Sequence, residues 1–535
     1  MKHGKTVLGA GIVFLFGIFI CFPLFGKGYI PTHDGEYHII RYIEFFRMLT
    51  AGYWFPRWSP TINSGYGMPI FLFHYPFPNY IGALCMSIGV DAVEAFKLSL
   101  ALGFMGSGIC SFLWLKKLFG VKAAVTGSLV SAFVPYWFVD IYVRGSVGEV
   151  WALSFVFASL LFLEYKMPIL FSFAIAALIL SHNILAMIFM PFLLGYSLLQ
   201  NRSYLKGIFF GIILSSYFWI PALLERGYVV GLNIVNFHEH FVELYEFLIP
   251  SWGTGFSGAV FGVNKMSFQI GIIPLAIIVG SIIIVWKEKN MSMKHLYWYY
   301  IIFVLCSIAV MFSWSSSLWE HIAFLSFVQF PWRFLSVIIP VTAFIAAYIS
   351  HGTRMRIWSI ILIGVSVFAS YSYIRPHIYE PRDEQYYASM SNFTDGTSSI
   401  ANTFSTIWTG WKTERPQYIL EVINGQVPGG LLENFYLRKT FSIISETGSE
   451  VYVPVLYYPG WKVFIDRKEV PIDYRTDGTI KFDVSPGMHT VRVVFTETPV
   501  RILSNILSIL TLVWLLGWGI LRVYAHRNRH ASSSQ

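Results

Sequence analysis

Residues 7–25, VLGAGIVFLFGIFICFPLF, form an apolar run without a charged side chain. A helix that crosses a lipid bilayer needs roughly 20 such residues. The run follows Lys2 and Lys5, as the apolar part of a signal peptide does, but its end, Cys21–Phe25, lacks the small residues that signal peptidase needs. We therefore expect a membrane-spanning helix that is retained.

Similar runs recur along the chain. The sequence of 535 residues is 55% hydrophobic and only 13% charged, whereas a soluble protein carries roughly 25% charged residues. These runs predict an α-helical polytopic membrane protein with about 12 spans. The predicted spans lie near residues 7–25, 94–115, 121–139, 149–165, 168–182, 184–200, 207–224, 268–286, 296–313, 334–350, 356–374 and 500–521.

Basic residues next to the runs predict the orientation, because cytoplasmic loops carry an excess of Lys and Arg. With the N-terminus inside, alternate connections hold the basic residues, as Lys116, Lys117 and Lys122 illustrate. We expect both termini in the cytoplasm and the chain in the plasma or inner membrane. The net charge of +9 then reflects topology, and we expect no nucleic-acid partner.

Residues 69–90 are apolar and long enough to span, but they contain Pro69, His74, Pro76 and Pro78. Prolines and polar groups disfavour a helix that faces lipid. We predict interfacial or re-entrant helices on the outer side of the membrane.

Short alternating strands distinguish the region before the last span. They are separated by the turn pairs Pro459-Gly460, Asp477-Gly478 and Pro486-Gly487. The pattern predicts an antiparallel, sandwich-like β-domain outside the cytoplasm, with Trp461 packed near the first turn. The expected division is a transmembrane domain over 1–374 with its first outer loop at 26–93, the β-domain over 375–499, and the last span with a cytoplasmic tail over 500–535.

The first outer loop begins with a series of ionisable side chains, namely His33, Asp34, Glu36, His38 and Arg41. If a helix starts near residue 35, His38 and Arg41 share one face and Asp34 lies at the helix entry. A carboxylate, two histidines and an arginine at the membrane surface could accept a proton and hold an anion. Asp is also an ordinary N-cap residue, and the spacing does not decide between a cap and a base.

Other outer turns add ionisable groups on the same side. Such groups at membrane depth are energetically unfavourable and are therefore functional candidates. Each has a structural alternative, because Arg57 could snorkel between its aromatic neighbours, Arg144 and Glu149 could simply pair, and His182 could cap a helix. Arg333, directly after a tryptophan, suggests a clamp for a lipid phosphate.

Several cofactor motifs are missing from the sequence. It contains no phosphate-binding loop, no CxxC and no HExxH. The four cysteines lie in apolar stretches without metal-ligand spacing. Transport driven by ATP is therefore not indicated.

Taken together, the motifs resemble a known family. The stretches His33-Asp34-x-x-x-His38-x-x-Arg41, Phe55-Pro-Arg-Trp58, Gly65-Tyr-Gly-x-Pro69, Phe73-His-Tyr-Pro76, Arg144-Gly145 with Glu149, Ser181-His-Asn183 and Phe330-Pro-Trp-Arg333 are similar to the bacterial "6-pyruvoyl-tetrahydropterin synthase-related" membrane proteins. The ending, with Tyr457-Tyr-Pro-Gly-Trp461, Asp466 and Pro486-Gly-x-His-Thr-Val491, resembles the related YfhO-like proteins. One departure is His74, where an aromatic residue is expected before Tyr-Pro.

The resemblance implies no pterin chemistry, because that enzyme is small and soluble and uses a metal-binding histidine set that this chain lacks. It implies instead the C-type glycosyltransferase (GT-C) architecture, which has an acidic residue in its first outer loop. The implied reaction moves a sugar from a polyprenyl-phosphate donor to a glycan, lipid or protein acceptor at the outer surface, among membrane lipids.

The same resemblance implies roles for particular residues. Asp34 would be the general base, and Arg57, Arg144 and Arg333 would neutralise the donor phosphate. The supporting residues would be His33, Glu36, His38, Arg41, Glu149 and His182, of which His33, Glu36 and His38 would shape the site or bind a divalent metal ion such as Mg²⁺ or Mn²⁺.

The alternative is a non-enzymatic role, as a transporter or flippase of lipid-linked glycans or as a scaffold for the cell envelope. A transporter typically carries ionisable residues near the midplane of the membrane. Here most polar residues lie at the ends of the spans, which favours an enzyme.

Overall fold

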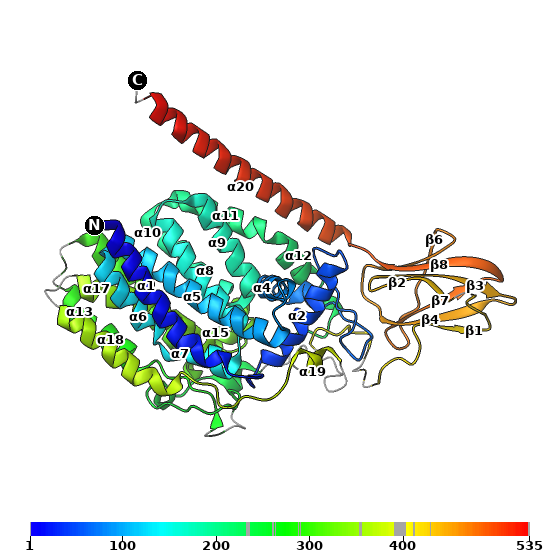
Figure 1. Ribbon diagram of the computed structural model, residues 1–535, viewed down its shortest axis with the longest axis horizontal. Helices are drawn as coiled ribbons and strands as arrows, with labels where there is room; N and C mark the ends of the chain where they lie inside the picture. Colours follow the sequence, from blue (N-terminus) through cyan, green and yellow to red (C-terminus); the bar gives the residue numbers. More distant parts are fainter. Residues whose placement is uncertain are drawn as a thin grey trace.

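The computed structural model describes residues 2–231, 236–258, 262, 264–286, 288, 290–351, 356–389, 403–409, 412, 414–428 and 430–532. They form a body of packed helices and a β-domain that projects from one end of it (Figure 1). The last helix, α20 (Pro499–Ser532), starts at the β-domain and runs back along the outside of the body. Both termini lie toward the end opposite the β-domain.

The helices agree with the predicted spans. Six are long and apolar enough to cross a membrane, and up to nine if each of three bent pairs is one span. Three shorter apolar helices match the remaining predictions, so the polytopic helical fold is confirmed. The unbent elements are α1 (Lys2–Cys21) with η1 (Phe22–Phe25), α5 (Ala92–Phe119), α8 (Val147–Glu164), α9 (Pro168–Ser181), α10 (Asn183–Gln200), α13 (Ile272–Val285), η9 (Pro331–Val337) with α17 (Ile338–His351), α18 (Arg356–Ser370) and α20.

One bend positions part of the candidate site. Helix α6 (Val121–Ala132) is followed by α7 (Pro135–Phe138) and a π-helical turn, η2 (Val139–Arg144), at 52°. The residue before a proline avoids the helical conformation, and Val134 is indeed extended, with ψ of 128°. The other bent pairs are α11 (Leu205–Leu214) with α12 (Ser216–Leu224), at 63°, and α14 (Met291–Ala309) with α15 (Ser316–His321), at 91°.

The first loop contains α2 (Gly35–Thr50), α3 (Ile70–Phe73) and α4 (Phe77–Ser87). Residues 69–90 thus form two short helices rather than one span. At 1.5 Å per residue, the 11 residues of α4 reach only about 16 Å, about half of the hydrocarbon core. Their position at the outer interface stays a prediction.

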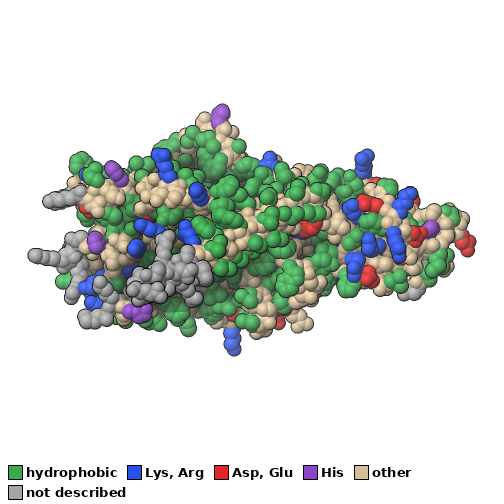
Figure 2. All heavy atoms as spheres, turned by 90° about the horizontal axis from the view of Figure 1, so that it is seen from above, with side chains coloured by type: hydrophobic (Ala, Val, Ile, Leu, Met, Phe, Trp, Pro, Cys, Tyr) green, Lys and Arg blue, Asp and Glu red, His purple; other side chains and the backbone are tan. Residues whose placement is uncertain are grey.

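The surface suggests how the body lies in the membrane. Figure 2 shows hydrophobic side chains over most of the helical body, whereas Lys, Arg, Asp and Glu gather at the β-domain and at the opposite end. An apolar belt between two charged ends is the surface expected for a protein that crosses a bilayer.

The β-domain contains two antiparallel sheets, with strand orders β1-β4-β7 and β2-β3-β8-β5-β6. Buried side chains of both sheets, such as Val453 and Val493, share one hydrophobic core, so the sandwich prediction is confirmed. The strands are β1 (Glu421–Ile423), β2 (Leu431–Phe435), β3 (Arg438–Ser445), β4 (Ser449–Leu456), β5 (Trp461–Ile465), β6 (Lys468–Val470), β7 (Thr479–Val484) and β8 (Gly487–Phe495).

The described strands begin at Glu421 rather than near the predicted boundary at 375. A short helix, α19 (Glu384–Ala388), lies between that boundary and the strands and packs near the start of α2. Residues 390–402 of the predicted domain lie outside the described residues.

A buried ion pair joins the β-domain to the body. Arg501, at the start of α20, donates to the Glu225 carboxylate from Nε at 3.0 Å and from Nη2 at 2.8 Å. Tyr458 contacts the same carboxylate at 3.3 Å. Trp461 is buried beside the Pro459-Gly460 turn, as predicted, and its ring meets the ring of Trp58 edge-on at 5.6 Å.

Candidate functional site

Asp34 precedes the first turn of α2 but does not cap it. Its backbone is helical, with φ of −110° and ψ of −6°, and its carboxylate accepts no hydrogen bond from the helix. An N-cap residue normally has an extended backbone and binds the N–H of the second or third helical residue. Within the described part of the chain, this half-buried carboxylate has no hydrogen-bond or salt-bridge partner.

The loop that carries Asp34 is fixed against the turn that follows η2. The Asp34 N–H donates to the carbonyl of Arg144 at 2.8 Å, and the His33 N–H donates to that of Val143 at 3.1 Å. Gly145 allows this approach because its φ is +64° and a Cβ there would lie 2.3 Å from Oγ1 of Thr32.

Glu149, in the first turn of α8, is the centre of a buried polar network. Its Oε1 receives hydrogen bonds from Arg144 Nη2 at 2.8 Å and from Arg333 Nε at 3.2 Å. Its Oε2 accepts from the Tyr136 hydroxyl at 2.8 Å. Arg144 also donates to Asp140 at 2.5 Å through Nη1. Two arginines are therefore balanced by two carboxylates inside this network.

Arg333 is the more accessible of the two arginines. Its Nη1 donates to the carbonyl of Val328 at 2.9 Å and to the Gln329 side chain at 3.2 Å. Its guanidinium lies 4.8 Å from the ring centroid of Phe330. No described residue accepts a hydrogen bond from its Nη2, which leaves the two N–H groups of this nitrogen for a bound anion.

His182 caps a helix and also lies beside the Glu149 network. Its Nδ1 accepts the Leu185 N–H at 3.1 Å and caps α10. Since Nδ1 is an acceptor there, the neutral ring carries its proton on Nε2, which lies 3.8 Å from Glu149. The cap thus orients the ring toward the network.

Histidines and an arginine form a second buried group on α2 and α3. Arg41 Nη1 lies 2.7 Å from His74 Nε2, and the His38 and His74 rings are 5.6 Å apart. Burial, together with the charge of Arg41, holds the pKa of His38 and of His74 well below the usual range. These rings are therefore neutral at pH 7, and Arg41 supplies the positive charge.

His33 lies against the second outer loop. Its Nε2 donates to the Thr254 carbonyl at 2.8 Å, and its ring meets the Phe256 ring edge-on at 5.5 Å. Burial lowers the pKa of His33, so the ring is neutral, and Nδ1 has no partner among the described residues. This buried lone pair could accept a hydrogen bond from a substrate.

Two predicted site residues are engaged elsewhere. Arg57 donates to the carbonyl of Tyr217 at 3.0 Å and to Asn505 at 2.8 Å, so it joins the first loop to α12 and α20. Glu36 forms an ion pair with Arg382. Neither side chain contacts the Glu149 network in the described structure.

Asp140 and Tyr136 were not among the residues predicted from sequence. Asp140 lies four residues before Arg144 in an apolar stretch, a spacing that pairs opposite charges on a helix. That signal was available in the sequence. The hydrogen bond from Tyr136 to Glu149 depends on the bend at Pro135 and has no comparable signal.

The predicted metal ligands do not form a metal site. Within the described residues, no three His, Cys, Asp or Glu side chains lie close enough together to hold an ion. His33 is bonded to Thr254 and Glu36 to Arg382, so neither joins His38 in a ligand set.

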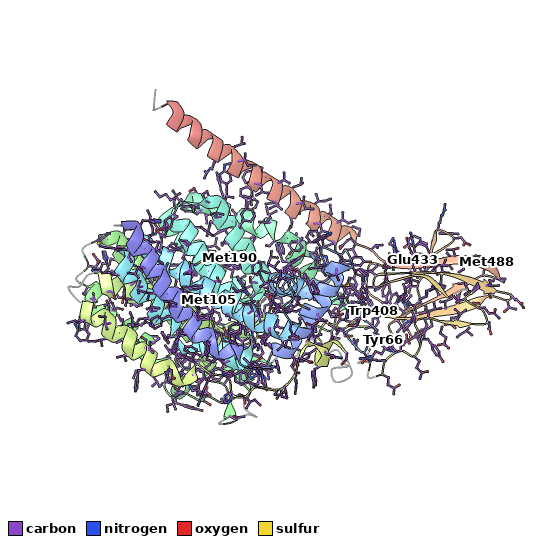
Figure 3. The ribbon with its side chains drawn as sticks, viewed as in Figure 1. Tyr66, Met105, Met190, Trp408, Glu433 and Met488 are labelled. Carbon is purple, nitrogen blue, oxygen red and sulfur yellow. The ribbon has the colours of Figure 1, made fainter. Side chains whose placement is uncertain are left out.

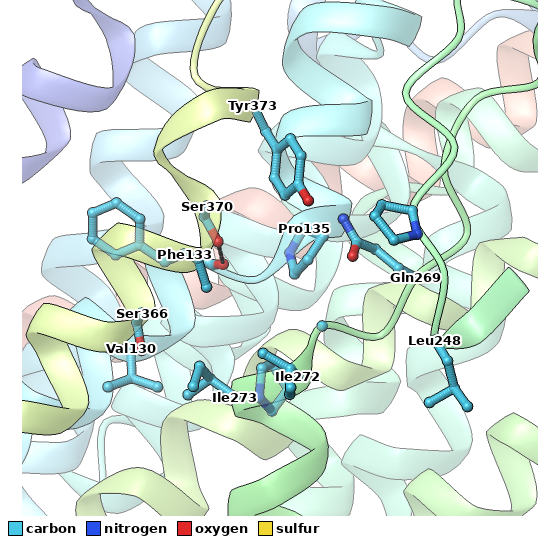
Figure 4. A pocket seen from close by; sticks show the side chains of 14 residues that line it. Val130, Phe133, Pro135, Leu248, Gln269, Ile272, Ile273, Ser366, Ser370 and Tyr373 are labelled. Carbon is cyan, nitrogen blue, oxygen red and sulfur yellow. Dashed lines mark hydrogen bonds between the residues drawn. The ribbon is translucent and has the colours of Figure 1, made fainter.

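A separate cavity of about 200 Å³ lies between the ends of α6, α13 and α18 (Figure 4). Gln269, Ser370 and Tyr373 line it, and Ser370 donates to the carbonyl of Phe133 at 2.8 Å. None of the predicted site residues lines this cavity.

Comparisons with known proteins give one family match and several distant structural matches. The profile of the "6-pyruvoyl-tetrahydropterin synthase related domain; membrane protein" family matches residues 71–376. No match is found among curated proteins.

Three of the structural matches are as follows. The arabinofuranosyltransferase AftD from Mycobacteria has 14% identity and a TM-score of 0.45, and the match covers 70% of this chain and 27% of that one. ArnT from Cupriavidus metallidurans bound to undecaprenyl phosphate has 15% identity and a TM-score of 0.39, and the match covers 69% of this chain and 64% of that one. The apo oligosaccharyltransferase of Archaeoglobus fulgidus has 14% identity and a TM-score of 0.34, and the match covers 78% of this chain and 61% of that one. The chain spans less than two thirds of each, and these scores are too low to assign an activity.

Proposed function

We propose that this chain, which belongs to the 6-pyruvoyl-tetrahydropterin synthase related family of membrane proteins, is a GT-C-type glycosyltransferase. It would take a sugar from a polyprenyl-phosphate donor and pass it to an acceptor hydroxyl outside the cytoplasm. The proposal is supported above all by the Asp34 carboxylate, which lies at the entry of α2 and yet caps nothing. A carboxylate that the fold does not use for its own stability is available as a base.

The proposed reaction needs one proton acceptor and one anion site. The acceptor hydroxyl loses its proton to Asp34 while its oxygen bonds to the anomeric carbon of the sugar. The bond from that carbon to the phosphate oxygen breaks, and polyprenyl phosphate leaves with the electron pair. Positive charge near the leaving group stabilises the transition state.

Arg333 is the residue proposed to meet the leaving phosphate, through its Nη2. Glu149, which also binds Arg144, fixes the guanidinium of Arg333 through its Nε, and the two carboxylates of the network already neutralise much of the charge of Arg144. His33 would accept a hydrogen bond from the sugar or the acceptor. We assign Arg57 and Glu36 to holding the loop in place, and no step passes through a metal ion.

The orientation of the chain can be tested separately. In a cysteine-free variant, a cysteine at the exposed Met488 of the β-domain should react with an impermeant maleimide in intact cells. A cysteine placed after Gln535 should react only once the membrane is permeabilised. Labelling of the C-terminal cysteine in intact cells would reverse the topology and remove Asp34 from the outer face.

Deletion of the gene tests the reaction without knowledge of the sugar. A polyprenyl-phosphate sugar should accumulate in the deletion strain, as measured by mass spectrometry of extracted lipids, and the wild-type gene should reverse this. Unchanged lipid-linked sugars after deletion would contradict the proposal.

Variants of Arg333 test the anion site in the same strain. We expect Arg333→Ala to complement poorly, with turnover lowered roughly 10²-fold, because it removes a charge at the leaving group. Arg333→Lys should restore part of the turnover, since Lys keeps the charge but not the planar fork. If Arg333→Ala complemented as well as wild type, the phosphate would have to bind elsewhere.

A further inference from the structure

An aromatic patch lies where the β-domain meets the helical body. It consists of Tyr228, Trp408, Tyr457 and Tyr474, which come from four separate segments. Figure 3 labels Trp408 and Tyr66 at this junction, whereas Met488 lies farther out on the β-domain. Among the patch residues, only Tyr457 packs against the core of the sandwich.

The four rings of the aromatic patch pack against one another. Tyr457 and Tyr474 stack with centroids 3.8 Å apart and planes 7° apart. Trp408 meets these two rings at 5.4 and 5.0 Å, and Tyr228 stacks on Trp408 at 5.9 Å. Gly478 brings the segments together, because a Cβ on it would lie 2.6 Å from Thr409.

The polar atoms of these rings are not used by the protein. In the described part of the chain, no residue forms a hydrogen bond with the three phenol groups or with the indole N–H of Trp408, and none of these atoms is buried. The adjacent Tyr458 differs, since it is buried and contacts Glu225. A buried tyrosine or tryptophan usually has such a partner, so the aromatic patch presents flat apolar faces with free hydrogen-bonding edges.

We infer that the aromatic patch binds a saccharide chain. A sugar ring offers an apolar C–H face that packs on an aromatic face, and hydroxyls around its edge that exchange hydrogen bonds with phenol and indole groups. Four half-exposed rings provide far less than the ~800 Å² per partner of a stable protein interface. The area therefore suits a few sugar units better than a folded partner.

The aromatic patch is connected to the proposed active site through the body. The segment that carries Trp408 also carries Phe404, whose ring stacks on Phe73 at 6.0 Å. The next residue, His74, contacts Arg41 of α2, the helix that begins after Asp34. This inference rests on the proposed function and extends it, because the acceptor would then be a glycan held at the aromatic patch while its end is modified.

The test uses the full-length protein in detergent on an array of defined oligosaccharides built from hexoses and N-acetylhexosamines. The best-bound oligosaccharide is then titrated in solution. We expect Trp408→Ala to raise its Kd by about tenfold or more, as for other central aromatic anchors. Tyr228→Ala, on an exposed turn, should do the same if Trp408→Ala is unstable. The matched control is Tyr436→Ala, an exposed tyrosine outside the aromatic patch that should bind as wild type does.

Two results would overturn the inference. One is that the wild-type protein binds no oligosaccharide on the array, and the other is that both variants of the aromatic patch bind as tightly as Tyr436→Ala. Binding of unglycosylated peptides in place of sugars would also overturn it. Asp34→Asn separates the two proposals, since it should keep saccharide binding and lose transfer. Intact transfer with unchanged saccharide binding in Asp34→Asn would contradict the catalytic role only.

Discussion

Asp34→Asn is expected to fold and insert normally and to lose glycan transfer by roughly 10²–10⁴-fold, the usual effect of removing a positioned general base. The substitution keeps the size of the side chain and removes only its charge and basicity. The assay is complementation of the deletion strain, with the accumulated polyprenyl-phosphate sugar measured by mass spectrometry and the amount of protein in the membrane measured by immunoblot.

The structure makes this substitution more decisive than it is from the sequence alone. If Asp34 were a cap, Asn would replace it well and nothing would change. Asp383 provides the matched control, because it caps α19 by accepting the Tyr386 N–H at 3.0 Å. Asp383→Asn should therefore retain both folding and transfer.

Full transfer by Asp34→Asn would refute the catalytic role. The other carboxylates of the region are poor replacements, since Glu36 is neutralised by Arg382 and Glu149 by two arginines. A base must accept a proton, and an adjacent guanidinium opposes this. His33, with its unpartnered Nδ1, would then be the next residue to test.

Hydrophobic periodicity and turn residues predicted the architecture well. The apolar runs and the turn at Pro459-Gly460 report local preferences, and local preferences decide where helices and strands begin and end. The same local view explains why α19 was not predicted, since nothing in the sequence around it marks a helix as short as Glu384–Ala388.

The same local patterns could not predict which side chains pair with one another in the site. Arg57 contacts Asn505 across 448 residues of sequence, and Arg333 contacts Glu149 across 184. An arginine between aromatic residues looks the same whether it binds a phosphate or joins two helices, so the spacing left both readings of Arg57 open. Whether Asp34 caps α2 was also undecided from the sequence. A cap depends on the backbone angles and on a side-chain hydrogen bond, which the residue type alone does not determine.

Glu149→Gln is expected to lower the stability of the protein, and not only its rate of glycan transfer. Removing one partner from a buried ion pair costs roughly 3–5 kcal/mol, because the remaining charge stays buried without compensation. Glu149 balances both Arg144 and Arg333, and after its loss the network would keep only the Asp140 carboxylate, which pairs with Arg144. We therefore expect a lower apparent melting temperature in detergent, measured by fluorescence-detected size exclusion after heating.

Glu164→Gln is the matched control, since Glu164 ends the same helix and bonds the neutral side chains of Tyr196 and Gln200. A Gln can replace a carboxylate there without leaving a buried charge, so this variant should melt close to wild type. Arg333→Met added to Glu149→Gln should recover part of the lost stability, because it removes the excess positive charge. If Glu149→Gln melted like Glu164→Gln, the network would not depend on its central charge. The contrast with Asp34→Asn, which should lose rate and keep stability, distinguishes the residue that reacts from the residue that holds the arginines in place.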